Sequence, residues 1–175
     1  MSFRNLPFFS FASWVISMSK EEQLYWAALG GDLEKVKSLC SDPALNINWQ
    51  NPKGGFTPLS VACIGGNIGV VRYLLSLKGI DPNMPTNEGA TPFFIACHNG
   101  HKEMVSLLLA DPRIDPNMQM NEGATPFFMA CQQGHKEVAS LLLADPRIDP
   151  TQADDEGYTP FFMVCQNGFP AVGRS

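Results

Sequence analysis

Hydrophobic and polar positions between residues 87 and 117 predict two short helices joined by a tight turn. The first is the apolar run at residues 92–97, and a helix that is hydrophobic on every side must be buried on every side. Gly100 interrupts this run, and beyond it apolar residues recur at helical spacing, at Met104, Val105, Leu107, Leu108 and Leu109. Asp111 and Pro112 end the second helix, because the residue before a proline is pushed out of the helical region.

The ends of this unit carry residues that start helices and make turns. The Thr91 hydroxyl suits the unpaired amides of a helix start, and Pro92 fits the first helical position, where no amide proton is needed. Asp115 and Pro116 follow the second helix, and the triplet 87–89 (Asn-Glu-Gly) precedes the first; both have turn-forming composition. Each unit is therefore expected to form a helix, a turn, a second helix and an extended loop.

The unit recurs with a fixed period of 34 residues. An apolar block ending in cysteine follows each Thr-Pro dipeptide, and the dipeptide begins at Thr57, Thr91, Thr125 and Thr159. A fixed period of roughly 20 to 50 residues is typical of a stacked array in which each unit contacts only its neighbours. No single unit can bury both of its helices, so neighbouring units must cover them.

Residues 89–109 read GATPFFIACHNGHKEMVSLLL and resemble the ankyrin repeat, whose pattern is G-x-TPLH-x-A-A-x-x-G-H-x-x-V-V-x-L-L-L. The resemblance covers residues 20–168 and recurs in phase. It implies an all-α fold, an ankyrin-repeat solenoid of stacked helix-turn-helix units joined by extended hairpin-like loops.

Two departures from the family pattern change the expected packing. The period is 34 instead of 33, consistent with one extra residue in DPRIDPN, where the family usually has G-A-D-V-N. The histidine of TPLH, which in the family is understood to hydrogen-bond near the threonine hydroxyl, is replaced here by Ser60, Phe94, Phe128 and Phe162. We therefore expect a stacked aromatic column, with hydrophobic packing between repeats in place of polar ties.

The period divides the chain into an array with two irregular ends. An apolar, serine-rich leader at 1–17 is expected to be disordered or an upstream extension, and a tail occupies 169–175. Between them we expect a capping repeat, three full repeats and a truncated half-repeat, at 20–48, 49–83, 84–117, 118–151 and 152–168. The half-repeat lacks its Leu-rich helix, so the helix at 136–143 would lose part of its cover. A longer array, self-association or a partner would have to supply that cover.

Repeats 84–117 and 118–151 are identical at 26 of 34 positions. Three of the eight differences are apolar exchanges within helices, at Ile95/Met129, Met104/Val138 and Val105/Ala139. The other five fall in the loops and at the end of the first helix, at Pro85/Gln119, Thr86/Met120, His98/Gln132, Asn99/Gln133 and Asn117/Thr151. In the family these regions form the concave face and loop tips, where partners bind. Harmless drift at solvent-facing positions would leave the same pattern.

The resemblance therefore implies a set of partner-binding residues on the concave face and loop tips, at equivalent places in successive repeats. They are Trp49, Asn51, Lys53, Ile64, Pro85, Asn87, Glu88, His98, Asn99, Gln119, Met120, Asn121, Glu122, Gln132, Gln133, Asp155, Glu156, Tyr158, Gln166 and Asn167. This surface is amide-rich and mildly acidic, and the apolar anchors expected near the loop tips are Trp49, Met84, Met118 and Met120. Trp49 has a second interpretation, as a residue that packs the capping repeat onto the next repeat.

Composition and charge narrow the class of partner. The chain has 175 residues, of which 45% are hydrophobic and 17% charged, as is typical of a globular protein. Its net charge is −5, and it lacks the clusters of lysine and arginine that bind nucleic acid or an anionic membrane. We therefore expect the partner to be another protein or a peptide, with no nucleic acid and no membrane involved.

Cysteine usage indicates the compartment. The number of cysteines is odd and no CxxC pair occurs, which argues against a disulfide framework and a zinc knuckle. A reducing compartment and a cytoplasmic location are therefore expected. The apolar run at 6–18 is too short to span a bilayer, and an export signal is the alternative to a tail or upstream extension.

No catalytic, metal or cofactor chemistry is expected. Cys97 and His101 are four residues apart, as are Cys131 and His135, but each cysteine falls in a small buried slot and each histidine lies beyond the glycine turn. Residues 65–69 lack the spacing of a phosphate loop, and the aspartates lack that of a calcium loop. The favoured function is a non-catalytic protein–protein interaction scaffold. The alternative is a fragment of a larger multidomain ankyrin protein, in which the array is a structural or regulatory targeting element.

Overall fold

The computed structural model describes residues 18–166, which form nine helices and no strand. The leader at 1–17, the tail at 169–175 and the candidate residue Asn167 lie outside the described residues. The helices are α2 (Lys20–Gly30), α3 (Leu33–Cys40), α4 (Pro58–Ile64), α5 (Ile68–Ser76), α6 (Pro92–His98), α7 (Lys102–Leu109), α8 (Pro126–Gln132), α9 (Lys136–Leu143) and α10 (Pro160–Gln166).

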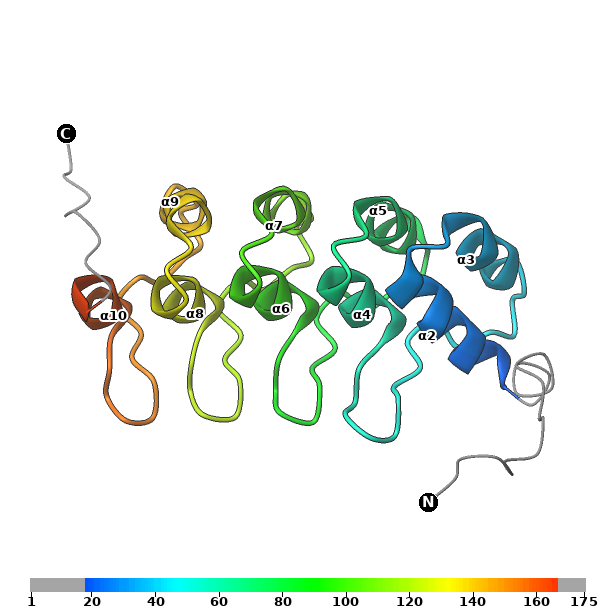
Figure 1. The fold of residues 1–175 in the computed structure, drawn as a ribbon, viewed down its shortest axis with the longest axis horizontal. Coiled ribbons are helices and arrows are strands. Elements are labelled where there is room, and N and C mark those ends of the chain that lie inside the picture. Colours follow the sequence, from blue (N-terminus) through cyan, green and yellow to red (C-terminus); the bar gives the residue numbers. More distant parts are fainter. Residues whose placement is uncertain (1–17, 167–175) are drawn as a thin grey trace, which may run out of the picture.

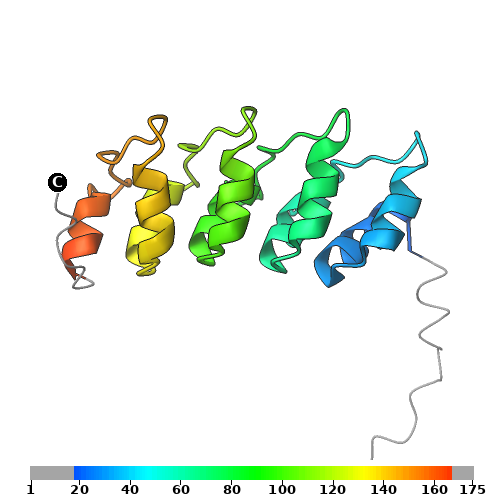
Figure 2. The same ribbon diagram turned by 90° about the horizontal axis from the view of Figure 1, so that it is seen from above.

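The helices form two layers that run the length of the molecule (Figure 1). The inner layer, next to the long loops, consists of α2, α4, α6, α8 and α10, and the outer layer consists of α3, α5, α7 and α9. Consecutive helices within each layer contact one another, and they lie side by side in a row when seen from above (Figure 2). The expected all-helical stack of helix-turn-helix units is confirmed.

The Thr-Pro dipeptides start the inner helices as expected. The hydroxyls of Thr57, Thr91 and Thr125 accept hydrogen bonds from the amide three residues later, at 3.1, 3.1 and 3.0 Å, and proline follows each threonine. In α4, the Ser60 hydroxyl also accepts from the Thr57 amide at 2.7 Å, which completes a reciprocal cap. Each cap satisfies an amide that a helix start leaves unpaired, and so fixes where the helix begins.

The inner helices supply much of the core, but the prediction of a stacked aromatic column is wrong. Phe94 and Phe128 are both buried in the common apolar cluster, yet their rings do not pair with each other. The ring pairs among residues 18–166 are Tyr25–Trp26, Tyr25–Trp49 and Tyr158–Phe162. Neighbouring packed helices stand about 8–10 Å apart, whereas ring centroids in an aromatic pair are about 4.5–7 Å apart. Equivalent phenylalanines in successive helices are therefore too far apart to stack.

Asparagine side chains provide polar ties between successive loops instead. Asn48, Asn83 and Asn117 each donate to a carbonyl in the following loop and accept from the amide two residues beyond it. For Asn117, the amide group donates to the Arg147 carbonyl at 2.6 Å and the oxygen accepts from the Asp149 amide at 3.1 Å. The stack is thus held by directional bonds as well as by burial of apolar surface.

Histidine and arginine side chains cap helix ends of the preceding helix pair. The His101 ring lies 3.2 Å from the Cys63 carbonyl near the end of α4. The Arg113 guanidinium donates to the Leu75 carbonyl near the end of α5 at 2.7 Å. Arg147, 34 positions after Arg113, donates to the equivalent carbonyl, that of Leu109, at 2.6 Å. The His135 ring lies 2.8 Å from the His98 carbonyl, one residue beyond the position equivalent to Cys63. Carbonyls at a helix end lack intrahelical partners and form the negative end of the helix dipole, which favours a cationic donor there.

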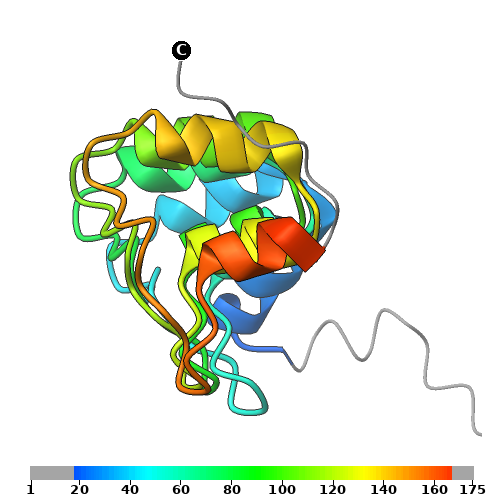
Figure 3. The same ribbon diagram turned by 90° about the vertical axis from the view of Figure 1, so that its left-hand side faces the viewer.

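The loops that precede the inner helices, residues 49–57, 84–91, 118–125 and 152–159, are called the hairpin loops below. Their backbones are bonded to each other: the Asn87 amide donates to the Gly54 carbonyl at 3.0 Å, and the Asn121 amide to the Glu88 carbonyl at 2.9 Å. Gly89 has φ of 84°, and a Cβ there would lie 2.8 Å from the Asn121 amide nitrogen, so glycine permits this close approach. Figure 3 shows the hairpin loops aligned along the stack and projecting from the inner layer.

The last described helix, α10, is the least covered of the inner helices. Phe161 exposes 71% of its surface, whereas Phe127, at the equivalent position of α8, exposes 5%. Leu143 in α9 exposes 45% of its surface, in agreement with the loss of cover expected for the helix at 136–143. Apolar surface is therefore exposed on the side of the stack formed by α9 and α10. Elsewhere, successive helix pairs bury such surface against each other.

Candidate functional site

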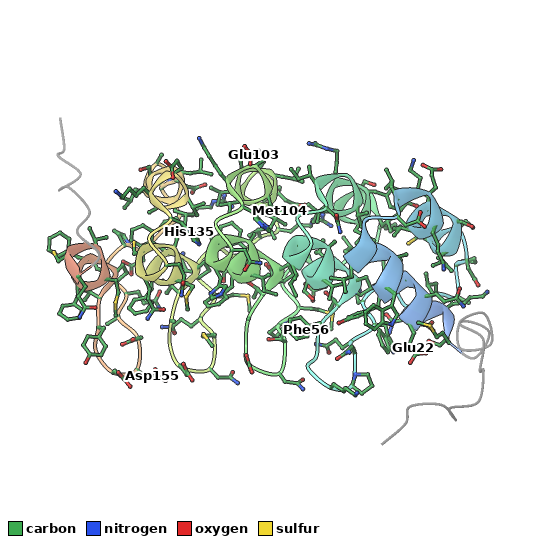
Figure 4. The ribbon with its side chains drawn as sticks, viewed as in Figure 1. Glu22, Phe56, Glu103, Met104, His135 and Asp155 are labelled. Atoms are coloured by element: carbon green, nitrogen blue, oxygen red, sulfur yellow. The ribbon has the colours of Figure 1, made fainter. Side chains whose placement is uncertain are left out.

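A groove of about 390 Å³ lies where the inner helices meet the hairpin loops. We call it the concave groove, and we call the surface made by the inner helices and hairpin loops the concave face. The residues that line it come from α4, α6 and α8 and from the loops before them: Phe56, Ile64, Thr86, Glu88, Ala90, Phe94, Ile95, His98, Asn99, Met120 and Met129. Figure 4 shows Phe56 on the loop side of the inner layer and Glu103 on the opposite, outer layer.

The floor of the concave groove is apolar because equivalent positions of successive inner helices carry apolar residues. Ile95 and Met129 occupy the same position in α6 and α8, 34 residues apart. Ile64, at the end of α4, exposes 40% of its surface although the helix is otherwise buried. His98 holds the equivalent place at the end of α6 and is exposed. An apolar floor with a few polar groups at its edge suits burial of a ligand side chain.

The hairpin loops of the concave face are acidic, and one of their acidic residues, Glu88, lines the concave groove. The helices α4, α6, α8 and α10 contain no Asp, Glu, Lys or Arg. The hairpin loops carry one basic residue, Lys53, and five acidic residues, Glu88, Glu122, Asp154, Asp155 and Glu156. None of these six takes part in the salt bridges of residues 18–166, which are Lys20–Asp42, Lys37–Glu34, Arg113–Asp111 and Arg147–Asp145. The concave face therefore carries negative charge that no ion pair neutralises.

A second pocket, of about 420 Å³, lies between α2 and the hairpin loop 49–57. We call it the aromatic pocket, and it is lined by Glu22, Tyr25, Trp26, Trp49, Asn51, Pro52 and Lys53. The Tyr25 ring stands nearly perpendicular to both indoles, with its centroid 5.3 Å from that of Trp26 and 6.1 Å from that of Trp49. Trp49 therefore packs the first helix pair onto the following loop, as its second interpretation expected, and it also forms a wall of the pocket.

Eight of the twenty predicted binding residues line one of these two pockets. The concave groove contains Ile64, Glu88, His98, Asn99 and Met120. The aromatic pocket contains Trp49, Asn51 and Lys53. Their distribution over α4, α6 and three hairpin loops shows that the stack brings together residues far apart in the sequence.

A second group of predicted residues holds the hairpin loops in shape. The Gln119 side chain donates to the Gly123 carbonyl at 2.6 Å, and the Asn121 side chain donates to the Asn87 carbonyl at 2.9 Å. The Pro85 carbonyl accepts a bond from a side chain of the preceding hairpin loop. Others are exposed and line neither pocket, namely Glu122, Gln132, Gln133, Asp155, Glu156, Tyr158 and Gln166. Asn167 lies outside the described residues.

The sequence patterns did not identify several residues that line the pockets. The exchange Ile95/Met129, assigned above to helix interiors, lies in the floor of the concave groove. Tyr25 and Trp26 were not among the predicted contacts, although they form walls of the aromatic pocket. One signal could have found Trp26: α2 buries Leu24, Ala27 and Ala28, so the helical period directs Trp26 away from the core.

Three of the cysteines of residues 18–166, namely Cys63, Cys97 and Cys131, are buried in the core. All five lie in this part of the chain and none is in a disulfide. Burial raises the pKa of Cys97 well above its ordinary value and the pKa of Cys131 to about 12, which keeps both thiols neutral. The His101 ring faces the Cys63 carbonyl. Over residues 18–166, no three side chains of His, Cys, Asp or Glu gather where they could hold a metal ion.

A third groove, of about 440 Å³, lies between α5 and α7 on the outer layer. Two of its charged residues are paired with each other, because the Arg113 guanidinium, which also bonds the Leu75 carbonyl, forms a salt bridge with Asp111 at 2.6 Å. The same contact lowers the pKa of the Asp111 carboxyl. In the concave groove, Glu88 has no salt bridge within residues 18–166, so we regard the concave face as the better candidate for binding.

Comparison with known proteins adds to this geometry. A family model described as "Ankyrin repeats (3 copies)" matches residues 24–120 and 112–174. No curated protein matches the chain. The match covers every inner and outer helix described above and both pockets, apart from the first residues of α2.

Proposed function

Because the chain belongs to the ankyrin-repeat family, whose members are generally protein–protein interaction modules, we propose that it binds a protein or peptide partner through its concave face. In this proposal the chain is a non-catalytic scaffold. A side chain of the partner occupies the concave groove, and the partner's backbone or polar groups contact the tips of the hairpin loops. The observation that carries the proposal is the concave groove itself, with its apolar floor and with Glu88 in its lining, which forms no salt bridge among residues 18–166.

The rigidity of the stack supports this role. Asparagine bridges and helix-end caps hold neighbouring repeats together, and loop-to-loop backbone bonds fix the hairpin loops before any partner arrives. A preorganised surface loses little conformational freedom on binding, so more of the contact energy remains as affinity. Apolar burial in the groove adds roughly 25 cal/mol for each Å² removed from water. Ile64 is the most exposed of the apolar residues in the groove, so we expect it to contribute strongly.

The proposal includes a reducing compartment such as the cytoplasm. It is supported by five cysteines of which none is in a disulfide, since proteins of oxidising compartments commonly use cysteine pairs as cross-links. Among residues 18–166, the helices are all too short or too polar to cross a membrane.

The proposed function is tested by capture of a partner from a lysate of the native cells, read by mass spectrometry. The full chain is compared with a groove variant carrying Ile64→Ala, His98→Ala and Met120→Ala. These side chains are exposed or half-buried, so the variant should keep the helical circular dichroism spectrum. The His98 carbonyl, which the His135 ring contacts at 2.8 Å, is retained in the variant.

A matched control carries three alanines on the outer layer, at Glu103, Ser106 and Glu137, all exposed. We expect a partner that the native chain and the control capture and the groove variant loses. Capture that is lost only in the control would place binding on the outer layer. Equal capture by all three chains would refute a role for the concave groove.

The open side of α10 favours a second candidate function, an assembly surface for a longer array or a second copy of the chain. Phe161 and Leu143 are highly exposed, and such apolar surface tends to mark an interaction site. Sedimentation equilibrium of the full chain and of Phe161→Ser tests the second copy. A mass that rises with concentration in the native chain alone would support it, and a monomer in both would exclude it.

A further inference from the structure

The aromatic pocket continues the surface of the concave groove toward the start of the chain. Trp26 stands in α2 at the position that Ile95 and Met129 hold in α6 and α8. The register is fixed by equivalent backbone bonds, because the alanine after each of these residues accepts from the amide five positions later. Figure 4 shows Glu22, at the pocket, and Phe56, at the groove, on the loop side of the inner layer. A bound segment that crosses the concave groove can therefore reach the aromatic pocket.

The rings of the aromatic pocket are available to a ligand. Trp26 exposes 51% of its surface, and α2 is anchored in the core without it, through Leu24, Ala27 and Ala28. Tyr25 stands at 82° to the Trp26 ring and at 84° to the Trp49 ring. The Tyr25 ring thus meets both indoles edge to face, and the three rings form walls of the pocket rather than a single stack. The face of an aromatic ring is electrostatically negative and attracts cations such as ammonium and guanidinium groups.

A carboxylate stands beside these rings. One oxygen of Glu22 accepts from the Ser19 amide at 2.9 Å, and this reciprocal helix cap holds the side chain in place. Glu22 makes no salt bridge among the described residues. Its charge therefore adds to the attraction of the ring faces for a cation, and the acidic hairpin loops extend the same sign of potential along the concave face.

Lys53 is the one opposing charge. It lines the aromatic pocket from the hairpin loop and is exposed. Its ammonium has no salt bridge within residues 18–166. An incoming cation would be repelled by Lys53 and attracted by Glu22, so the two residues should influence a cationic ligand in opposite directions.

We propose that the aromatic pocket binds an arginine or lysine side chain of the partner. The partner is then a basic segment that lies along the acidic hairpin loops. This inference rests on the proposed function, since it assigns the chemistry of the partner that the concave face binds. The shared ligand chemistry is a cationic side chain, an ammonium or a guanidinium group.

The inference is tested by nuclear magnetic resonance of the full chain with ¹⁵N-labelled tryptophan. The probes are N-acetyl-arginine amide and N-acetyl-lysine amide, with N-acetyl-norleucine amide as the neutral control of similar length. We expect both cations to shift the indole signals of Trp26 and Trp49 in a saturable way, and the neutral probe to shift them far less. Equal shifts with the neutral probe, or no saturable shift with either cation, would overturn the inference.

Two charge variants sharpen the test. Glu22→Gln removes the charge and keeps the cap, because glutamine also bonds back to the helix start, and it should weaken cation binding roughly threefold. Lys53→Ala should strengthen it by roughly the same factor, since the repelling charge is gone. Trp26→Leu should abolish the saturable shift at Trp49 while the fold is kept. Two charge variants with the same sign of effect, or with none, would contradict the assignment.

The outcomes separate this inference from the proposed function. If the groove variant loses the captured partner but no cation binds the pocket, only the inference fails. If cations bind the pocket but the groove variant captures the partner unchanged, the concave-groove function fails and the pocket remains a cation site.

Discussion

One asparagine side chain ties each pair of successive loops between residues 48 and 149. Asn117 donates to the Arg147 carbonyl and accepts from the Asp149 amide, so ordering one side chain satisfies two backbone groups. At the equivalent position of the next loop, the Thr151 hydroxyl donates to the Asp149 carboxylate within its own loop. The exchange Asn117/Thr151 between the two similar repeats therefore replaces a bond between loops with a bond within one loop. It does not alter the concave face.

We predict that Asn117→Ala destabilises the protein by about 1–2 kcal/mol, because a net hydrogen bond contributes about 0.5–1.5 kcal/mol and two are lost. Thr151→Ala is the matched control and should change the free energy of unfolding by less than about 0.5 kcal/mol. Urea denaturation followed by circular dichroism measures both. Equal effects of the two substitutions would mean that the bridge does not hold neighbouring loops together.

The buried cysteines should react slowly with thiol reagents. Burial raises the pKa of Cys63, Cys97 and Cys131, in the last case to about 12, and the thiolate is the reactive form. Near pH 8 we expect Cys165, which is exposed, to be labelled first and these three only on unfolding. Mass spectrometry of peptides after timed alkylation measures the order. Labelling of Cys97 as fast as Cys165 would contradict its burial.

The same pKa shifts give a pH dependence of stability. A thiol whose pKa is raised in the folded state stabilises the fold fully below its unfolded value, about 8.5, and this contribution is lost as pH rises toward the folded value. The free energy of unfolding should therefore fall in alkali, and it should fall less in Cys131→Ala than in the native chain. Parallel curves for the two chains would contradict the shift at Cys131.

Among the helices, those that begin with Thr-Pro could be predicted closely from the sequence. Their starts are set by local chemistry, a threonine hydroxyl and a proline, and their ends by glycine turns, so no long-range information is needed. The aromatic column failed for the opposite reason: whether Phe94 and Phe128 touch depends on the spacing between helices. The aromatic pocket was missed because it forms only when α2 and the hairpin loop 49–57 meet, and α2 departs from the repeat pattern.

The same phenylalanine-to-alanine substitution should lower the free energy of unfolding by different amounts in α8 and α10. Phe127→Ala removes a side chain with 5% exposure and should destabilise by about 3–5 kcal/mol, as large-to-small changes in a core do. Phe161→Ala removes one with 71% exposure from the equivalent position and should cost less than about 1 kcal/mol. Thermal or urea denaturation of both variants measures the difference. Similar costs would show that α10 is packed as fully as α8.

Across the whole molecule, the two layers divide the charged residues unevenly. The salt bridges of residues 18–166 lie along the loops and helices of the outer layer and at the first helix pair, while the hairpin loops keep acidic side chains without ionic partners. The hairpin loops thus leave their carboxylates without ionic partners within residues 18–166, beside the apolar floor of the concave groove. This combination of acidic loops and an apolar floor is the physical reason for proposing partner binding on the concave face.

The most direct test of that assignment is site-specific photo-crosslinking in native cells. A benzophenone amino acid replaces Ile64 in the concave groove in one chain and Glu103 on the outer layer in the other (Figure 4). We predict a discrete protein adduct from position 64 and none from position 103. An adduct from position 103 alone, or the same adducts from both positions, would contradict binding through the concave face.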